Sequence, residues 1–237
     1  MTKFYGIGVG PGDPELLTIR GLNALKSADI IVAPKARIKG ESVARDIIEK
    51  VLDIQKEFIE LEFPMTKNED ELTKRYRRAA GLIIDKMEAG NSIAYLTIGD
   101  PLLYSTYIYL LSALKEAAPE LEIETIPGIA AYSATASRLN YSLAEKDERV
   151  CICPVPPGME TLRRVIEEND TVVIMKVAKK LPEVLGLLEE MGLLKNTVLG
   201  SRVGFENEKL INGEAGSFEV AEKEGYLSTI IVRNRKG

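Results

Sequence analysis

The chain has 237 residues, of which 45% are hydrophobic and 28% are charged, a composition typical of a folded globular protein with one large or two small domains. It contains no histidine and no tryptophan, which excludes imidazole as a general base or a metal ligand. The net charge of −5 argues against a broad nucleic-acid surface. No apolar run approaches the roughly 20 residues that span a bilayer. We therefore expect a cytoplasmic protein that acts on small molecules, with no membrane segment and no metal site.

The first half of the chain alternates strands and helices, which is the pattern of a mainly parallel sheet. Strands are expected over residues 4–9, 29–33, 57–63 and 92–98. Helices are expected over residues 15–27, 41–52, 69–89 and 102–117, with Gly90 and Pro119 as stop signals after the last two. This pattern predicts an N-terminal α/β domain over residues 1–118.

The second half begins in the same way and then becomes richer in strands. Strands are expected over residues 121–126, 149–153 and 171–177, and helices over 129–139, 160–168 and 181–191. Three further strands, over 197–203, 208–212 and 226–232, are separated by turn signals around Gly204 and Gly213, which favours hairpins in a mixed sheet. The sequence thus predicts a second α/β domain over residues 119–237, and an α/β fold with two domains.

A glycine-rich segment, Gly6-Ile7-Gly8-Val9-Gly10-Pro11-Gly12-Asp13, follows the first strand. Glycines at this place let a backbone approach a pyrophosphate. The dinucleotide pattern fails, however, because its last glycine falls on Pro11 or on Asp13, and the ending of a Walker A loop is absent. The segment is therefore either a tight structural turn or a ligand loop of another kind.

Two further segments lie where a strand passes into a helix. Gly99-Asp100-Pro101 repeats the earlier Gly12-Asp13-Pro14, and in each the Asp suits an N-cap and the Pro the first helical position. Pro127-Gly128 then precedes small residues at a helix start, where backbone groups are open to a ligand. For Asp100 alone, a capping role is the simpler interpretation.

Taken in this order, residues 8–14, 99–101 and 126–129 resemble the tetrapyrrole methylase family, and residues 172–176, 202–208 and 227–232 resemble its later segments. Within that family, Phe63-Pro64-Met65-Thr66 and residues 100–107 are most similar to the methyltransferases that act on carbon 20 of precorrin-2 or cobalt-factor-2 in cobalamin biosynthesis. The resemblance implies two α/β domains with S-adenosylmethionine in a cleft between them, a tetrapyrrole substrate and a homodimer.

The resemblance also implies which residues contact the cofactor. These are Pro11, Ile98, Gly99, Asp100, Leu103, Ala130, Ala131, Met175, Val203, Ser228 and Thr229. Ala130 occupies a position where the family often has a hydroxyl residue, which puts that side-chain contact in doubt. From spacing alone, Met175 is equally well explained as core filling at a strand end.

Methyl transfer from a sulfonium to carbon needs alignment and exclusion of water more than a covalent helper, so the absence of histidine is no obstacle. Asp100 and Tyr104 are the candidates to take or relay the proton that the acceptor carbon loses. The carboxylates of the substrate need cationic partners, for which Lys35, Arg37 and Lys39 are the candidates after the second strand. The group Lys74-Arg75-Arg77-Arg78 is better explained as a solvated helix face.

Other functions remain open at this point. Relatives that share the fold methylate another corrin carbon, the ribose of ribosomal RNA, or a histidine derivative on a translation factor, although the acidic charge weighs against RNA. A non-catalytic nucleotide-binding module would also explain glycine-rich loops.

Overall fold

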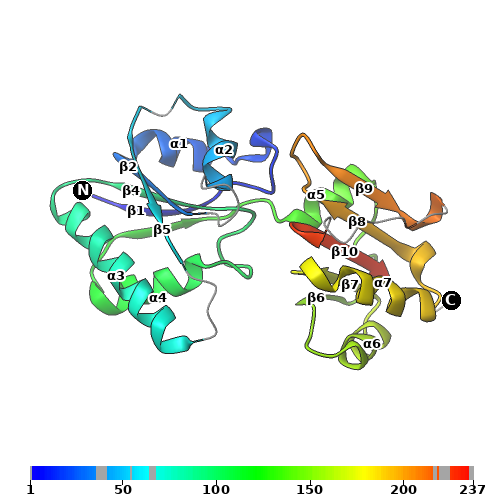
Figure 1. The fold of residues 1–237 in the computed structure, drawn as a ribbon. Helices are drawn as coiled ribbons and strands as arrows, with labels where there is room; N and C mark the ends of the chain where they lie inside the picture. Colours follow the sequence, from blue (N-terminus) through cyan, green and yellow to red (C-terminus); the bar gives the residue numbers. More distant parts are fainter. Residues whose placement is uncertain are drawn as a thin grey trace. The chain divides into compact units, whose positions relative to one another are not determined.

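The computed structural model describes residues 2–35, 42–53, 55–63, 68–215, 218 and 225–234. Its contacts divide the chain into two compact units, Met1–Ala130 and Ala131–Gly237, called here unit 1 and unit 2 (Figure 1). Each unit is built from one five-stranded sheet with helices packed on it. The predicted α/β fold is confirmed.

The sheet of unit 1 is entirely parallel, with the strand order β3-β2-β4-β1-β5. Its strands are β1 (Phe4–Gly8), β2 (Ile30–Pro34), β3 (Glu57–Leu61), β4 (Ile93–Thr97) and β5 (Ile123–Ile126). Because β5 pairs with β1 through Phe4↔Ile123 to Ile7↔Ile126, it belongs to the first sheet. The predicted boundary between residues 118 and 119 is therefore corrected to a division after Ala130.

Helices cover both faces of this sheet (Figure 1). The helices are α1 (Ile19–Ser27), α2 (Val43–Glu49), α3 (Glu69–Glu88) and α4 (Tyr107–Ala117). The main core lies between the sheet and α3 and α4, where alternate strand residues such as Ile93 and Tyr95 pack against Ile83 and Leu110. Side chains of a strand alternate between faces, so the residues between them face α1 and α2.

Two helices of unit 1 begin later than predicted. Asp13 caps a short 3-10 helix, η1 (Pro14–Leu16), and α1 begins only at Ile19, where Thr18 Oγ1 accepts the Gly21 N–H at 3.0 Å. The helix expected from residue 102 begins at Tyr107, so Asp100 is not its N-cap. The predicted start of α2 at Glu41 and the segment Pro64-Met65-Thr66 lie outside the described residues.

Unit 2 has the predicted mixed sheet, with the strand order β6-β7-β10-β8-β9. Its strands are β6 (Val150–Pro154), β7 (Thr171–Met175), β8 (Thr197–Ser201), β9 (Lys209–Asn212) and β10 (Ser228–Arg233). β6 and β7 are parallel, and β10 runs antiparallel to both β7 and β8. The start of β10 therefore lies at the same end of the sheet as the carboxyl ends of β7 and β8.

The helices of unit 2 also lie on both faces. They are α5 (Ala131–Arg138), α6 (Met159–Glu168) and α7 (Leu181–Glu190), with short 3-10 helices η2 (Ala178–Lys180), η3 (Leu194–Asn196) and η4 (Gly213–Ala215). α6 and α7 bury one face, whereas α5 packs on the other. Gly200 lets α5 approach, because a Cβ there would lie 2.3 Å from Thr135 Oγ1.

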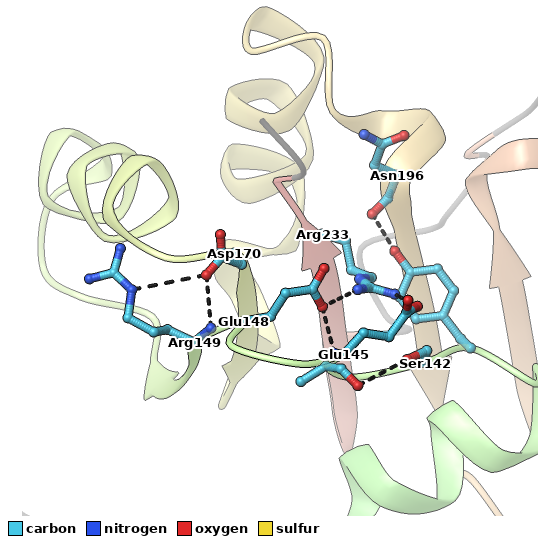
Figure 2. Close-up of polar contacts among 9 residues, drawn as sticks. Ser142, Glu145, Glu148, Arg149, Asp170, Asn196 and Arg233 are labelled. Atoms are coloured by element: carbon cyan, nitrogen blue, oxygen red, sulfur yellow. Dashed lines mark hydrogen bonds and ion pairs between the residues drawn. The ribbon is translucent and has the colours of Figure 1, made fainter. Parts of the chain in front are cut away.

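An ion-pair cluster fastens the segment between α5 and β6 to the last residue of β10 (Figure 2). Arg233 is 6% exposed and pairs with Glu145 at 3.3 Å and, more closely, with Glu148. Arg233 lies opposite Thr171, the first residue of β7. The cluster thus stands at the end of the sheet away from Met175. Among the described residues, no helix combines the length and apolar character needed to cross a membrane.

Candidate functional site

The topology of unit 1 marks the carboxyl ends of β1 and β4 as a ligand site. The chain leaves β1 towards β2, on one side, and leaves β4 towards β5, on the other side. Neighbouring parallel strands whose connections leave in opposite directions form a topological switch point, and ligands of open α/β sheets bind beyond the carboxyl ends of such strands.

Three loops meet at this point, and we call residues 8–13, 98–105 and 127–130 the three-loop cluster. The Gly99 N–H donates to the Gly10 carbonyl at 2.8 Å, within an isolated antiparallel bridge between these two residues. The Gly128 N–H donates to Asp100 Oδ2 at 3.2 Å. The structure therefore brings together the three motifs that the sequence singled out.

Glycine is required where these loops touch. A Cβ on Gly8 would lie 2.5 Å from the Gly99 carbonyl oxygen, and a Cβ on Gly128 would lie 2.2 Å from the same oxygen. Gly99 itself has φ +70°, a conformation that L residues with side chains adopt at a cost. The cluster is thus packed backbone against backbone.

Asp100 joins two of the loops with one carboxylate. Its Oδ1 accepts the Leu102 N–H at 2.9 Å, while its Oδ2 accepts the Gly128 N–H. Hydrogen bonds to a carboxylate are stronger than neutral ones, and both oxygens are engaged here. The contacts of Asp100 are those of a positioning residue, and its predicted catalytic role stays untested.

Tyr104 has an unusual backbone for a bulky residue, with φ 51° in the left-handed region. The loop is fixed beside it, because Ser105 Oγ contacts Thr97 Oγ1 at 2.9 Å and accepts the Tyr107 N–H at 3.1 Å. Strain of this kind persists only where surrounding contacts determine it, and it concentrates at functional sites. Tyr104 is 39% exposed, so the strained loop carries its ring at the surface of the cluster.

A buried hydroxyl network supports the cluster from below. Tyr107 Oη lies 2.6 Å from Thr125 Oγ1, and its ring fills the space above Gly6, where a Cβ would come within 2.2 Å. Burial raises the pKa values of Tyr95 and Tyr107, which keeps both phenols protonated. These side chains therefore support the cluster by packing and hydrogen bonding.

The charges of the three-loop cluster distinguish between ligands. Its segments contain no lysine or arginine, and their charged side chains are Asp13 and Asp100. Leu102 and Ile129 add exposed apolar surface, at 56% and 37%. A pyrophosphate would find no cationic partner here. Backbone donors, apolar surface and two carboxylates instead suit a cationic, phosphate-free ligand such as a sulfonium-bearing nucleoside.

The remaining predicted cofactor residues of unit 1 lie in the same cluster. Pro11, Gly99 and Ala130 are buried, whereas Ile98 and Leu103 are partly exposed. Ala131, the first residue of α5, belongs to unit 2, and its carbonyl accepts the Thr135 hydroxyl at 2.8 Å.

In unit 2, the predicted cofactor residues gather at one end of the sheet, and we call Met175, Val203, Ser228 and Thr229 the sheet-end group. Met175 ends β7, Ser228 and Thr229 begin β10, and Val203 follows β8. Ser228 lies opposite Ser201, which fixes this arrangement by register. The side chains of Val203, Ser228 and Thr229 are at most 5% exposed.

The predicted substrate residues are less well supported. Lys35 Nζ pairs with Glu62 Oε1 at 3.0 Å, an ion pair that raises the pKa of Lys35 and lowers that of Glu62. Arg37 and Lys39 lie outside the described residues. In the group Lys74-Arg75-Arg77-Arg78, all four side chains are exposed on α3, and Arg77 pairs with Glu116, as expected of a solvated face.

Sequence reasoning missed the strained residues around the sheet-end group. Lys176, Ala178, Arg202 and Leu227 all have positive φ, and all lie in the segments that follow β7 and β8 or precede β10. None of these four residues is a glycine or an asparagine, the types that favour a left-handed backbone, so their residue types do not indicate it.

Comparisons with known proteins identify the family of the chain. The family model described as Tetrapyrrole (Corrin/Porphyrin) Methylases matches residues 3–219. A Methanocaldococcus jannaschii protein named probable cobalt-precorrin-2 C(20)-methyltransferase is 37% identical, over 99% of this chain and 97% of its own length. The cobalt-precorrin-2 C(20)-methyltransferase of Salmonella typhimurium is 30% identical, over 87% of this chain and 86% of its own.

Solved structures share the fold. The uroporphyrin-III C-methyl transferase of Thermus thermophilus, complexed with S-adenyl homocysteine, superimposes with a TM-score of 0.65 at 19% identity. The match covers 98% of this chain and 97% of that one.

Proposed function

Because the chain belongs to the tetrapyrrole (corrin/porphyrin) methylase family, we propose that it is an S-adenosylmethionine-dependent methyltransferase of cobalamin biosynthesis. It transfers a methyl group to carbon 20 of precorrin-2 or of cobalt-factor-2. The observation that carries this proposal is the 37% identity to a protein named as a C(20)-methyltransferase over 99% of this chain.

S-adenosylmethionine contacts the three-loop cluster through backbone groups, with Pro11, Ile98, Gly99, Asp100, Leu103 and Ala130 as the contact residues. Ala131, the first residue of α5, is a further contact residue. The residues of the sheet-end group, Met175, Val203, Ser228 and Thr229, complete the set. The lack of lysine and arginine in the cluster supports this assignment, since the cofactor carries a sulfonium and no phosphate. The glycine contacts support it further, because they fix the loop backbones in advance and so reduce the cost of ordering them on binding.

When bound, the cofactor supplies an activated methyl group that is carried on its sulfonium sulfur. The chain's own residues hold the two reactants in line, which is the main source of acceleration for such a displacement. Asp100 keeps the second and third loops in register through its two hydrogen bonds. Leu102 and Ile129 are exposed apolar side chains of the cluster, and reactants that bind there would be shielded from water by them.

The acceptor carbon must lose one proton after methylation. Tyr104 and Asp100 are the two candidates, and Tyr104 is 39% exposed beside the cluster. A phenol hydroxyl relays a proton to solvent without becoming a strong base itself. Lys35, Arg37 and Lys39 remain candidates for contacts with substrate carboxylates.

The acceptor is a small molecule in this proposal, and the enzyme is a cytoplasmic homodimer that needs neither nucleic acid nor a membrane. Sedimentation analysis of the purified protein at micromolar concentration checks the dimer. A monomer under those conditions would contradict the proposed homodimer.

The experiment that tests the function is incubation of the purified protein with methyl-labelled S-adenosylmethionine and a set of acceptors. The set contains precorrin-2, cobalt-factor-2, later corrin intermediates, ribosomal RNA and a translation-factor substrate. Label should pass to precorrin-2 or cobalt-factor-2 and to no macromolecule. Transfer to RNA or protein alone would contradict the proposal, and binding of cofactor without transfer to any acceptor would favour a non-catalytic module.

A further inference from the structure

Two cations flank the start of β10, next to the sheet-end group. Lys176 follows Met175, the last residue of β7, and Arg202 follows Ser201, the last residue of β8. β10 lies between these strands and begins at Ser228. Neighbouring strands are about 4.8 Å apart, so the backbones of the two cations are separated by about 10 Å.

The loop that carries Arg202 is held by its own hydrogen bonds. The Arg202 N–H donates to the Leu227 carbonyl at 3.0 Å, and its carbonyl accepts the Phe205 N–H at 3.0 Å. Both Arg202 and Leu227 have a left-handed backbone, with φ 49° and 56°. A strained residue on each side of one hydrogen bond indicates a fixed loop and not a loose one.

The guanidinium group of Arg202 is oriented but has no carboxylate partner in the described ranges. Its Cζ lies 5.8 Å from the centroid of the Tyr226 ring. The glutamate that closes the same loop, Glu208, is engaged with the Gly204 N–H at 2.7 Å and with Arg138 at 3.4 Å. The planar fork of Arg202 is therefore available to an external anion, for which it is well suited.

Lys176 completes the arrangement on the other side of β10. Its backbone is also left-handed, with φ 56°. Its side chain is exposed, yet the pKa of its ammonium group is lowered, because surrounding atoms remove part of its hydration and no described carboxylate compensates. A cation kept partly dehydrated and without a partner gains most when an anion binds.

We propose that Lys176 and Arg202 bind carboxylate side chains of the tetrapyrrole from either side of the start of β10 and thereby orient the macrocycle. This inference rests on the proposed function and assigns substrate contacts to unit 2 in addition to the candidates after β2. The ligand chemistry is that of a rigid ring bearing several carboxylates, which two fixed cations bind more selectively than either binds alone.

The test is equilibrium binding of precorrin-2 to the protein saturated with S-adenosylhomocysteine, so that no turnover occurs. The variants are Lys176→Gln, Arg202→Gln and the double variant, and Arg202→Lys tests rescue by charge. Lys195→Gln is the matched control, because Lys195 is an exposed lysine in η3, which precedes β8 and stands at the opposite end of the sheet. Each titration is repeated over a series of KCl concentrations.

Each single variant should weaken precorrin-2 binding by about tenfold and the double variant by more, with a smaller salt dependence than the wild type. Arg202→Lys should recover part of the affinity, and S-adenosylhomocysteine affinity should stay within about twofold in all variants. Equal precorrin-2 affinity in the double variant and in Lys195→Gln would overturn the inference while leaving the proposed function intact. A wild-type protein that binds S-adenosylhomocysteine but not precorrin-2 would contradict the proposed substrate itself.

Discussion

Asp100 uses one carboxylate to hold two backbone N–H groups, 2.9 Å and 3.2 Å from its two oxygens. An asparagine at this position keeps a single acceptor oxygen, and its NH2 group would face one of the two donors. The carboxylate of Asp100 therefore has a structural role, because both of its oxygens accept backbone hydrogen bonds. Asp13, in the matching Gly-Asp-Pro segment, accepts only one side-chain hydrogen bond in the described part of the chain, from the Glu15 N–H at 2.9 Å.

Asp100 and Asp13 should therefore respond differently to replacement by asparagine. Asp100→Asn should lower the free energy of unfolding by about 1–2 kcal/mol and weaken S-adenosylmethionine binding, because one of the two backbone N–H groups loses its acceptor. Asp13→Asn should keep the wild-type free energy of unfolding, since asparagine caps as well as aspartate. Thermal unfolding and calorimetric titration measure the two effects. A wild-type cofactor affinity in folded Asp100→Asn would show that the clamp is not needed for binding.

Tyr104 separates the role of a hydroxyl from that of a ring. In Tyr104→Phe, the strained loop and the exposed ring remain, but the proton relay is lost, so kcat should fall by about a hundredfold while KM for the tetrapyrrole changes little. Steady-state kinetics with precorrin-2 check this. An unchanged kcat would leave proton removal to solvent and limit Tyr104 to packing.

Single residues also show where sequence reasoning stops. Asp100 and Gly128 are predictable because Gly-Asp-Pro and Pro-Gly are cap and turn signals where a strand passes into a helix. Arg202 and Leu227 gave no such signal, because a left-handed backbone at arginine or leucine results from contacts with distant strands. The pairing of Lys35 with Glu62 likewise depends on the register of β2 and β3, which spacing along the chain does not reveal.

At the scale of elements, the loops after β1, β4 and β5 act as one packed unit. A methyl group on Gly128 would lie only 2.2 Å from the Gly99 carbonyl oxygen, so the two loops could not keep their present distance. Gly81, in the middle of α3, has nothing within 4 Å of such a methyl group.

Gly128→Ala should therefore lower the free energy of unfolding by at least about 2 kcal/mol and abolish measurable cofactor binding, because the loops must separate. Gly81→Ala should instead stabilise the protein by up to about 1 kcal/mol, since alanine is the better helix former. Chemical denaturation of both variants decides the point. Equal stability of the two would mean that the three loops are not closely packed.

The Arg233 cluster makes a separate prediction for the far end of the second sheet. Arg233→Met should lower the free energy of unfolding by about 1–3 kcal/mol, because Glu145 and Glu148 lose their buried partner. The buried Nε of Arg233 has no partner among the described residues, which offsets part of this loss. Cofactor affinity should not change, since the cluster lies at the end of the sheet away from Met175. A parallel loss of cofactor affinity in calorimetry would contradict this separation.

The order of strands and helices was predictable, because alternation of apolar residues and glycine stop signals reflect local preferences. The first residue of each helix was harder to predict. α4 was expected from residue 102, and it begins at Tyr107 because Asp100 and Ser105 bind backbone groups of their own loop. Such side-chain to backbone bonds compete with helix formation and depend on tertiary neighbours.

At the scale of the whole molecule, the boundary between the two units depends on strand pairing and not on the end of a helix. Pro119 is a good helix stop and favours a domain boundary beside it, yet β5 follows it and completes the first sheet beside β1. A stop signal is local, whereas strand pairing is not, so the sequence could locate the break in the helix and not the end of the domain. The α/β class and the positions of the three motifs do not depend on this boundary. They could be predicted from local pattern and from family resemblance.

The central claim is methyl transfer to carbon 20, and it is tested most directly by following the methyl carbon. S-adenosylmethionine labelled with carbon-13 in its methyl group is incubated with the purified protein and precorrin-2 or cobalt-factor-2, and the product is examined by NMR. The account predicts one labelled methyl group, attached to carbon 20, and stoichiometric release of S-adenosylhomocysteine. Label on another corrin carbon, or no label in either acceptor, would contradict it.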